Sequence, residues 1–192
     1  MARDIEENYI LWMDAFLRLM QKENYFDISV EDIAREAGMS RVGFYNYFPD
    51  KEELLWKTYR YVFMEVETKV TSMDPTTLLS DGKPLTYYVF ENVKKNRAFF
   101  RNLFCEGMPF EFQAKLTDYI AKESFRTHED LRKKYRRTDF PYFLINEYLT
   151  GALLAVLRSI LSTDAEWDSE RLSEFFTALA APGILSMLAN QT

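Results

Sequence analysis

The chain has 192 residues, of which 47% are hydrophobic and 28% charged, and its formal net charge is −6. This length and composition are typical of a globular protein that buries a core in one domain or two small ones. A single cysteine, Cys105, excludes an intramolecular disulfide and agrees with a reducing cytoplasm. The N-terminal segment MARDIEENYILWMDAF lacks the pattern of a signal peptide, and the apolar stretch LTGALLAVLRSIL is too short for a bilayer and contains Arg158. We therefore expect a cytoplasmic protein that does not enter a membrane.

The periodic signals along the chain are almost all helical, and strand signals are absent. Apolar residues recur at helical spacing over about residues 5–22 and predict a first amphipathic helix. Ser29 followed by Asp32 has the form of a capping box, so a second helix is expected to start at Val30. Gly38 is expected to end that helix, because glycine adopts the left-handed conformation that closes helices.

Two further helix starts follow at once. Ser40 is suited to cap a short helix over residues 41–47, which Pro49 ends. The sequence PDKEE has the form of a second capping box and opens a long helix over about residues 51–71. Three caps within about twenty residues predict a helix, a tight turn, a second helix and a supporting helix, which is helix-turn-helix geometry at about residues 29–48.

The short second helix of such a motif enters the DNA major groove. Phe44 and Phe48 lie four residues apart and are expected to face the core, which turns the remaining side chains outward. A guanidinium can make a bidentate contact with guanine, whereas a tyrosine hydroxyl is suited to a phosphate oxygen. The alternative for the tyrosines is plain packing. The residues expected to face DNA by this reasoning are Arg41, Val42, Tyr45 and Asn46, with Tyr47 and Lys51 beside them.

The net charge argues against nucleic acid as a partner. Residues 1–60 contain eight Lys or Arg and twelve Asp or Glu, which gives this region a charge of −4. Between Ala37 and Pro49, however, Arg41 is the only charged residue, so one surface is expected to be free of acids. Phosphate attraction depends on that local surface, and we expect salt-sensitive binding with modest non-specific affinity.

The stretch SVEDIAREAGMSRVGFYNYFPDKEELL resembles the N-terminal domain of the TetR family of bacterial transcriptional repressors. That family has a Ser or Thr cap, then D-I-A, A-G-V-S, Y-x-x-F, a Pro and K-E-x-L, which read here as Ser29, DIA at 32–34, AGMS at 37–40, YNYF at 45–48 and PDKEEL at 49–54. The resemblance covers residues 5 to about 65. The remaining two thirds match only in helical layout and length.

This resemblance implies an all-α fold with an N-terminal three-helix DNA-binding domain over residues 1–65 and a C-terminal effector-binding and dimerisation domain over residues 66–192. It implies a homodimer that binds a palindromic operator in double-stranded DNA and is released by a small-molecule effector. By motif position, Ser29, Ser40, Tyr45, Tyr47 and Lys51 would contact phosphates, whereas Arg41, Val42, Gly43 and Asn46 would face bases. The family often has Gly at position 42 and Thr, Ser or Ala at 43, so the operator sequence does not follow by analogy.

Beyond a break containing Pro75, Gly82 and Pro84, helices are expected at about residues 85–95, 97–105, 109–135, 140–162 and 169–188. The first of these are rich in aromatic residues, which suits a pocket for a hydrophobic or aromatic effector. Most of the aromatic side chains must belong to the core. The candidate pocket residues are Phe90, Phe100, Phe104, Phe112, Tyr119 and Tyr148, with polar contacts from Asn146 or Glu147.

The last two predicted helices carry the argument for a dimer. Gly151, Ala155 and Ser159 fall four residues apart and form a stripe of small residues that lets another helix approach closely. Leu172 and Phe176 belong to an apolar face of the final helix. Two such helices from each of two chains would form a four-helix interface with two-fold symmetry, although packing within one subunit explains the periodicity equally well. Two half-sites on DNA require a dimer, which favours the first reading.

An enzyme is the weakest hypothesis. His128 is the sole histidine, and with Cys105 alone there is no cluster with zinc-site spacing and no Cys-His pair. The sequence also has no glycine-rich phosphate loop and no nucleophile elbow. We therefore expect no metal and no cofactor. The main alternative to a DNA-binding regulator is a protein of the same fold whose head binds a protein partner.

Overall fold

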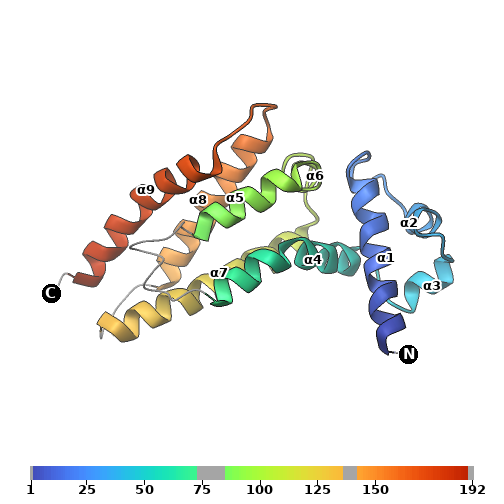
Figure 1. Cartoon of the computed structure of the whole chain (residues 1–192), viewed down its shortest axis with the longest axis horizontal. Coiled ribbons are helices and arrows are strands. Elements are labelled where there is room, and N and C mark those ends of the chain that lie inside the picture. The colour runs from blue at the N-terminus through green and yellow to red at the C-terminus, as the bar shows by residue number, and fades with distance from the viewer. Residues whose placement is uncertain (1, 73–84, 136–141, 190–192) are drawn as a thin grey trace. The chain divides into compact units, whose positions relative to one another are not determined.

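A computed structural model describes the backbone of residues 2–72, 85–135 and 142–189, and the side chains of residues 7–69, 85–123, 143–184 and 186. Over these ranges the chain is helical and contains no β-strand (Figure 1). The predicted all-α fold class is confirmed. The predicted break around Pro75 and Pro84 lies outside the described residues, as does the side chain of His128.

The helices begin and end close to the positions expected from the caps. They are α1 (Ala2–Met20), α2 (Val30–Ala37), α3 (Arg41–Tyr45), α4 (Lys51–Ser72), α5 (Leu85–Lys95), α6 (Arg97–Cys105), α7 (Phe110–Tyr135), α8 (Tyr142–Leu161) and α9 (Ser169–Ala189). The third helix is shorter than the predicted 41–47. The N–H groups of Asn46 and Tyr47 donate to the carbonyls of Gly43 and Phe44, three residues back, so the helix tightens into a turn before Pro49.

The chain forms two compact units, each built from two segments that are separated in the sequence. The first, called here the head unit, comprises residues 1–65 and 96–112, and the second unit comprises residues 66–95 and 113–192. Helices α1, α2, α3 and α6 therefore belong to the head unit together with most of α4. Residues 96–112 lie within the span that was predicted to belong to the C-terminal domain, so the C-terminal helices do not all form one compact unit.

Local hydrogen bonds explain the sharp turn between α2 and α3. Gly38 has φ of 68°, and its N–H donates to the carbonyl of Arg35 at 3.2 Å. The N–H of Met39 donates to the carbonyl of Ala34 at 2.9 Å. These two bonds form a Schellman motif, in which a glycine in the left-handed conformation closes the helix. The turn therefore depends on Gly38, because other side chains are strained at this φ.

Aromatic side chains fill the core of the head unit. Trp12 and Phe16 of α1 are fully buried, as are Phe44 and Phe48 next to the turn. The Trp12 and Phe44 rings meet edge to face with centroids 5.5 Å apart. Such pairs add about 0.5–1.5 kcal/mol beyond the burial of their area. The short helix α3 is thus held by packing against α1, since five residues are too few for an isolated helix.

The second unit is held by packing of α5 against α9. Val89, Phe90 and Val93 form the buried stripe of α5. The ammonium of Lys94 donates to the carbonyl of Trp167 at 2.9 Å, just before α9 begins. In the same unit the Tyr119 hydroxyl donates to Glu67 Oε1 at 2.6 Å, which joins α7 to the C-terminal half of α4.

Candidate nucleic-acid interface

Helix α3 presents an exposed face that carries a single charge. Phe44 is fully buried, whereas Arg41, Val42, Tyr45 and Asn46 are exposed. Val42 and Tyr45 are 75% and 49% exposed. The expected division of this helix into an inward and an outward face is confirmed. The outward side chains offer one guanidinium, one amide, one phenol and one apolar group, a set suited to reading base edges.

Two residues of α1, Asn8 and Tyr9, fix the end of the turn that follows α3. The Tyr9 ring meets the Tyr47 and Phe48 rings edge to face, with centroids 5.2 and 5.3 Å apart. The Tyr9 hydroxyl donates to the Tyr47 carbonyl at 3.3 Å, and Asn8 Nδ2 donates to the Tyr47 hydroxyl at 2.9 Å. The Tyr47 hydroxyl keeps its own proton for donation, so a phosphate contact is compatible with this geometry. The role of Asn8 had no signal in the sequence, because a single amide on an amphipathic helix carries no pattern.

Gly43 lies on the inner side of α3. A Cβ atom at this position would lie 3.2 Å from Ser40 Oγ and 3.9 Å from Trp12 Cζ2. The backbone N–H of Gly43 donates to Ser40 Oγ at 3.0 Å and completes the N-cap of the helix. Gly43 was expected to face bases. In the structure, a side chain at this position would instead point toward Ser40 and Trp12.

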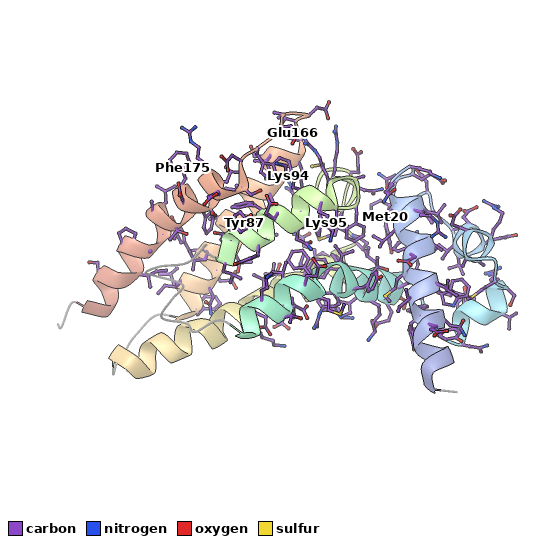
Figure 2. The ribbon with its side chains drawn as sticks, viewed as in Figure 1. Met20, Tyr87, Lys94, Lys95, Glu166 and Phe175 are labelled. Atoms are coloured by element: carbon purple, nitrogen blue, oxygen red, sulfur yellow. The ribbon has the colours of Figure 1, made fainter. Side chains whose placement is uncertain are left out.

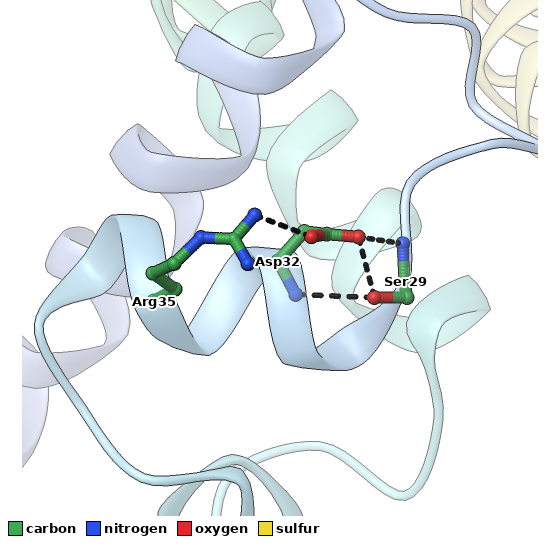
Figure 3. Close-up of polar contacts among 3 residues, drawn as sticks. All are labelled: Ser29, Asp32 and Arg35. Carbon is green, nitrogen blue, oxygen red and sulfur yellow. Dashed lines mark hydrogen bonds and ion pairs between the residues drawn. The ribbon is translucent and has the colours of Figure 1, made fainter.

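Ser29 begins α2 in a complete capping box (Figure 3). Its Oγ accepts from the Asp32 N–H at 3.1 Å, while its own N–H donates to Asp32 Oδ2 at 3.0 Å. Arg35 Nη2 donates to the other carboxylate oxygen of Asp32 at 2.5 Å. The Ser29 hydroxyl also donates to Asp32, so its hydrogen is used within the box. A phosphate bound here would be met by the exposed Arg35 guanidinium, a residue that the motif comparison did not single out.

The same contacts hold the pKa of the Asp32 carboxyl below its ordinary value, chiefly through the side-chain and backbone hydrogen bonds from Ser29 and then the bond from Arg35. A carboxyl with a depressed pKa in the folded state stabilises the fold above its unfolded pKa. This contribution is lost as the pH falls through the lowered pKa of Asp32.

Ion pairs offset part of the acidic charge of the head unit. Arg18 Nε donates to Glu36 Oε1 at 2.6 Å, and this contact lowers the pKa of the Glu36 carboxyl. Lys57 and Glu53 lie 3.6 Å apart on α4. These exposed pairs contribute little stability, but they place several acids beside a compensating cation. The exposed face of α3 itself carries only Arg41.

Lys51 has partners within the protein that the sequence did not indicate. Its Nζ donates to the carbonyls of Tyr25 at 2.8 Å and Ile28 at 2.6 Å, and it lies 4.2 Å from the centroid of the Tyr25 ring. Partial burial lowers the pKa of the Lys51 ammonium. Two of its three N–H donors are thus used to hold the loop between α1 and α2. Sequence spacing could not reveal this, because the acceptors are backbone carbonyls about twenty-five residues away.

The structure divides the candidate effector residues between the two units. Phe100 and Phe104 stack with centroids 5.8 Å apart, and Phe112 packs edge to face on Trp56 at 6.0 Å, all within the buried core of the head unit. Phe90 and Tyr119 belong to the second unit. Tyr148, also in the second unit, is 65% exposed. The six residues therefore do not form a cluster within one unit.

One described recess lies in the second unit, away from the candidate effector residues. Its volume is about 470 Å³, and its lining includes Tyr87, Lys94 and Glu166, whose side chains lie near one another in Figure 2. Lys94 and Glu166 lie 3.8 Å apart. The recess is open and lined mainly by charged residues, so it does not resemble the apolar pocket that was expected.

The candidate dimer residues lie on the exposed surface of α8 and on α9. Gly151, Ala155 and Ser159 are all exposed, whereas Leu172 and Phe176 are half-buried. Large apolar side chains on the same two helices are also exposed, namely Phe143, Leu144, Tyr148, Phe175 and Leu179. The small-residue stripe is therefore not used for packing between the helices described in one protomer.

Comparison with known proteins gives a consistent result. Residues 13–56 match the model for bacterial regulatory proteins of the tetR family. The chain is 29% identical over 154 residues to the HTH-type dhaKLM operon transcriptional activator DhaS of Lactococcus lactis, covering 75% of this chain and 74% of that protein. A segment of 38 residues, 20% of this chain and 18% of the other, is 50% identical to the HTH-type transcriptional regulator EthR of Mycolicibacterium smegmatis.

A solved structure has a similar fold. The structure of NalD, the secondary repressor of the MexAB-OprM multidrug efflux pump in Pseudomonas aeruginosa, superposes with a TM-score of 0.70 at 17% identity, covering 93% of this chain and 96% of that one. These relatives are transcriptional regulators and not enzymes. Together with the capped turn and the exposed face of α3, the match over residues 13–56 shows that the head of this chain is a DNA-binding domain of the tetR type, and the chain as a whole is similar to transcriptional regulators.

Proposed function

We propose that the protein is a ligand-responsive repressor that binds a palindromic operator as a homodimer in the cytoplasm. The observation that carries the DNA-reading part of this proposal is the exposed face of α3, where Arg41 is the only charge and Val42 and Tyr45 project from a buried Phe44 anchor. Arg41, Val42 and Asn46 would read bases, and Tyr45, Tyr47 and Ser40 would contact phosphates.

Homodimerisation is supported by the exposed apolar surface of the second unit. Phe143 and Leu179 are 79% and 82% exposed, and the stripe of Gly151, Ala155 and Ser159 is open. Monomeric proteins rarely expose large apolar patches, and a two-fold partner would bury these side chains against a second copy.

Helix α8 is largely apolar. The apolar part of α8 is longer than the predicted stretch LTGALLAVLRSIL, because Phe143–Leu161 is long and apolar enough to cross a membrane by length and composition. Its inward side, however, carries the buried polar residues Asn146 and Thr150, and its exposed side carries Glu147 and Arg158. Charged and polar groups on opposite sides are costly in lipid but ordinary in a helix bundle.

A small effector is proposed to bind within the second unit, where Phe90 is buried. Thr150 Oγ1 is buried and has no hydrogen-bond partner in the described structure. A ligand with an apolar body and one hydrogen-bonding group would satisfy this hydroxyl, since buried polar groups are costly when unpaired. Such binding would release the operator.

Substitution of α3 tests the DNA-reading proposal. Arg41→Ala should lower affinity for a preferred duplex by about 1–3 kcal/mol and relax the base preference at one position. Tyr45→Phe, which removes only a hydroxyl, should weaken binding to all duplexes about equally. The measurement is a competition titration with single-base variants of a duplex that the protein binds. An Arg41→Ala protein with unchanged affinity and preference would show that α3 does not read bases.

The second candidate function is a head that binds a protein partner instead of DNA. The charge of −4 over residues 1–60 favours it, because an acidic surface repels phosphates at long range. The exposed Arg41 and Tyr45 on α3 favour the DNA-binding proposal instead. A folded dimer that enriches no duplex from a random pool at low salt would support the second candidate.

A further inference from the structure

A side chain from α6 holds the loop between α1 and α2, although the two lie far apart in the sequence. Asn102 is only 7% exposed. Its Nδ2 donates to the carbonyl of Met20 at 2.9 Å and to the carbonyl of Glu23, and its Oδ1 accepts from the N–H of Tyr25 at 3.0 Å. Both ends of this buried amide are therefore used on the backbone of one loop.

These contacts occur where the backbone needs them. Met20 is the last residue of α1, and the final carbonyls of a helix have no partner within the helix. Asn102 supplies one. The loop is held from a second side by Lys51, which donates to the carbonyls of Tyr25 and Ile28. Ser29 follows directly and is the N-cap of α2, so fixing this loop fixes where the helix-turn-helix begins.

Helix α6 is itself firmly placed within the head unit. Phe100 is fully buried and meets the rings of Tyr59 and Phe63 of α4 at centroid distances of 6.5 and 5.6 Å. Leu103, next to Asn102, is also fully buried. The helix thus contacts α4 through aromatic rings and the α1–α2 loop through one amide.

We propose that Asn102 is a positioning residue for DNA binding, whose amide fixes the α1–α2 loop, and with it α2 and α3, to helix α6. The expected effect on DNA binding rests on the proposed function, whereas the contact between Asn102 and the loop does not. Only Asn96 separates α6 from α5 in the chain, so the helix that carries Asn102 follows directly on a helix of the second unit.

An amide is required because the loop presents two acceptors and one donor. Asn102→Asp keeps the shape and the acceptor for Tyr25 but directs a second acceptor at the carbonyls of Met20 and Glu23. Asn102→Leu keeps a similar size and satisfies none of the three groups. Buried backbone groups left without partners are costly, so the loop is expected to leave its position in both variants.

The test compares these variants with Leu103→Ala, which weakens the same helix by leaving a cavity but keeps the amide. Hydrogen exchange of the full chain is followed residue by residue. Affinity is measured for a duplex that the wild-type protein enriches from a random pool, at a temperature where every variant is folded. We expect Asn102→Asp to raise exchange selectively at residues 20–29 and to weaken DNA binding at least about tenfold, a loss of about 1.4 kcal/mol. Leu103→Ala should speed exchange across the head unit and leave the affinity of the folded protein within about threefold.

The outcomes separate the two claims. Unchanged exchange at residues 20–29 in both Asn102 variants would overturn the inference, as would a loss of affinity no larger than that of Leu103→Ala. If Asn102→Asp does not fold, Asn102→Leu is measured instead. If the wild-type protein enriches no duplex, the proposed function fails, and selective exchange at the loop then supports only the part of the inference that concerns the loop, namely that Asn102 fixes it to α6.

Discussion

At the scale of single residues, the head unit combines an outward face on α3 with a lysine, Lys51, whose ammonium donates to a loop. In a short helix, spacing by four assigns Phe44 and Phe48 to the core, and the remaining positions must face outward. Both phenylalanines are fully buried. The partners of Lys51 are carbonyls of a loop whose path follows from tertiary packing, so no periodic pattern encodes them. The same holds for Asn102.

The two readings of Lys51 predict different behaviour of Lys51→Met. If the ammonium mainly holds the loop, the substitution should lower the free energy of unfolding by about 1–3 kcal/mol, because bonds to a charged donor are lost. The salt dependence of DNA binding should then stay unchanged. Chemical denaturation and DNA titrations at several salt concentrations measure both quantities.

Lys57→Met on the same helix is the matched control. Lys57 is exposed and pairs with Glu53 at 3.6 Å, so its loss should cost less than about 1 kcal/mol. A Lys51→Met protein of normal stability whose salt slope falls by about one unit would instead assign Lys51 to a phosphate.

At the scale of elements, helix boundaries were predictable wherever a cap marked them. The starts of α2, α3 and α4 at Val30, Arg41 and Lys51 coincide with the predicted positions. The end of α3 was missed because Asn46 and Tyr47 form a tighter turn in which Tyr47 is anchored by α1. The grouping of α6 with the head also had no sequence signal, because it depends on contacts between residues about eighty positions apart.

The cap of α3 should matter more for DNA binding than its size suggests. Ser40→Ala removes the acceptor for the Gly43 N–H and should lower the free energy of unfolding by about 1 kcal/mol. With only five residues in the helix, fraying at its start displaces Arg41 and should weaken DNA binding as well. Ser40→Thr keeps the acceptor and should restore both, as measured by denaturation and duplex titration. Equal DNA affinity in Ser40→Ala would contradict a reading role for this helix.

At the scale of the whole molecule, the proposal requires two copies of the chain. Each protomer has one reading helix, whereas a palindrome has two half-sites about 34–36 Å apart or a multiple of that spacing. The sequence alone left the position of the candidate interface open. Periodicity located the small-residue stripe on α8, but whether that stripe packs inside the protomer depends on its exposure, and Gly151, Ala155 and Ser159 are exposed.

Placing a charge in the exposed apolar surface tests the dimer. Leu179→Glu should shift the protein from dimer to monomer, because two carboxylates would be buried near a two-fold axis without partners. Ala114→Glu, an exposed position of α7 in the second unit, should leave the dimer intact. Sedimentation velocity at micromolar concentration distinguishes the two. A Leu179→Glu protein that remains dimeric would place the interface elsewhere.

The central claim is that a dimer reads a palindrome through α3. The most direct test is selection of bound duplexes from a random DNA pool by the purified protein at two salt concentrations, with Arg41→Ala in parallel. We predict that the wild-type protein enriches a palindrome, more weakly at the higher salt concentration, and that Arg41→Ala loses one base preference symmetrically in both half-sites. Enrichment of no sequence at low salt by a folded dimer would contradict the account and favour a protein partner for the head.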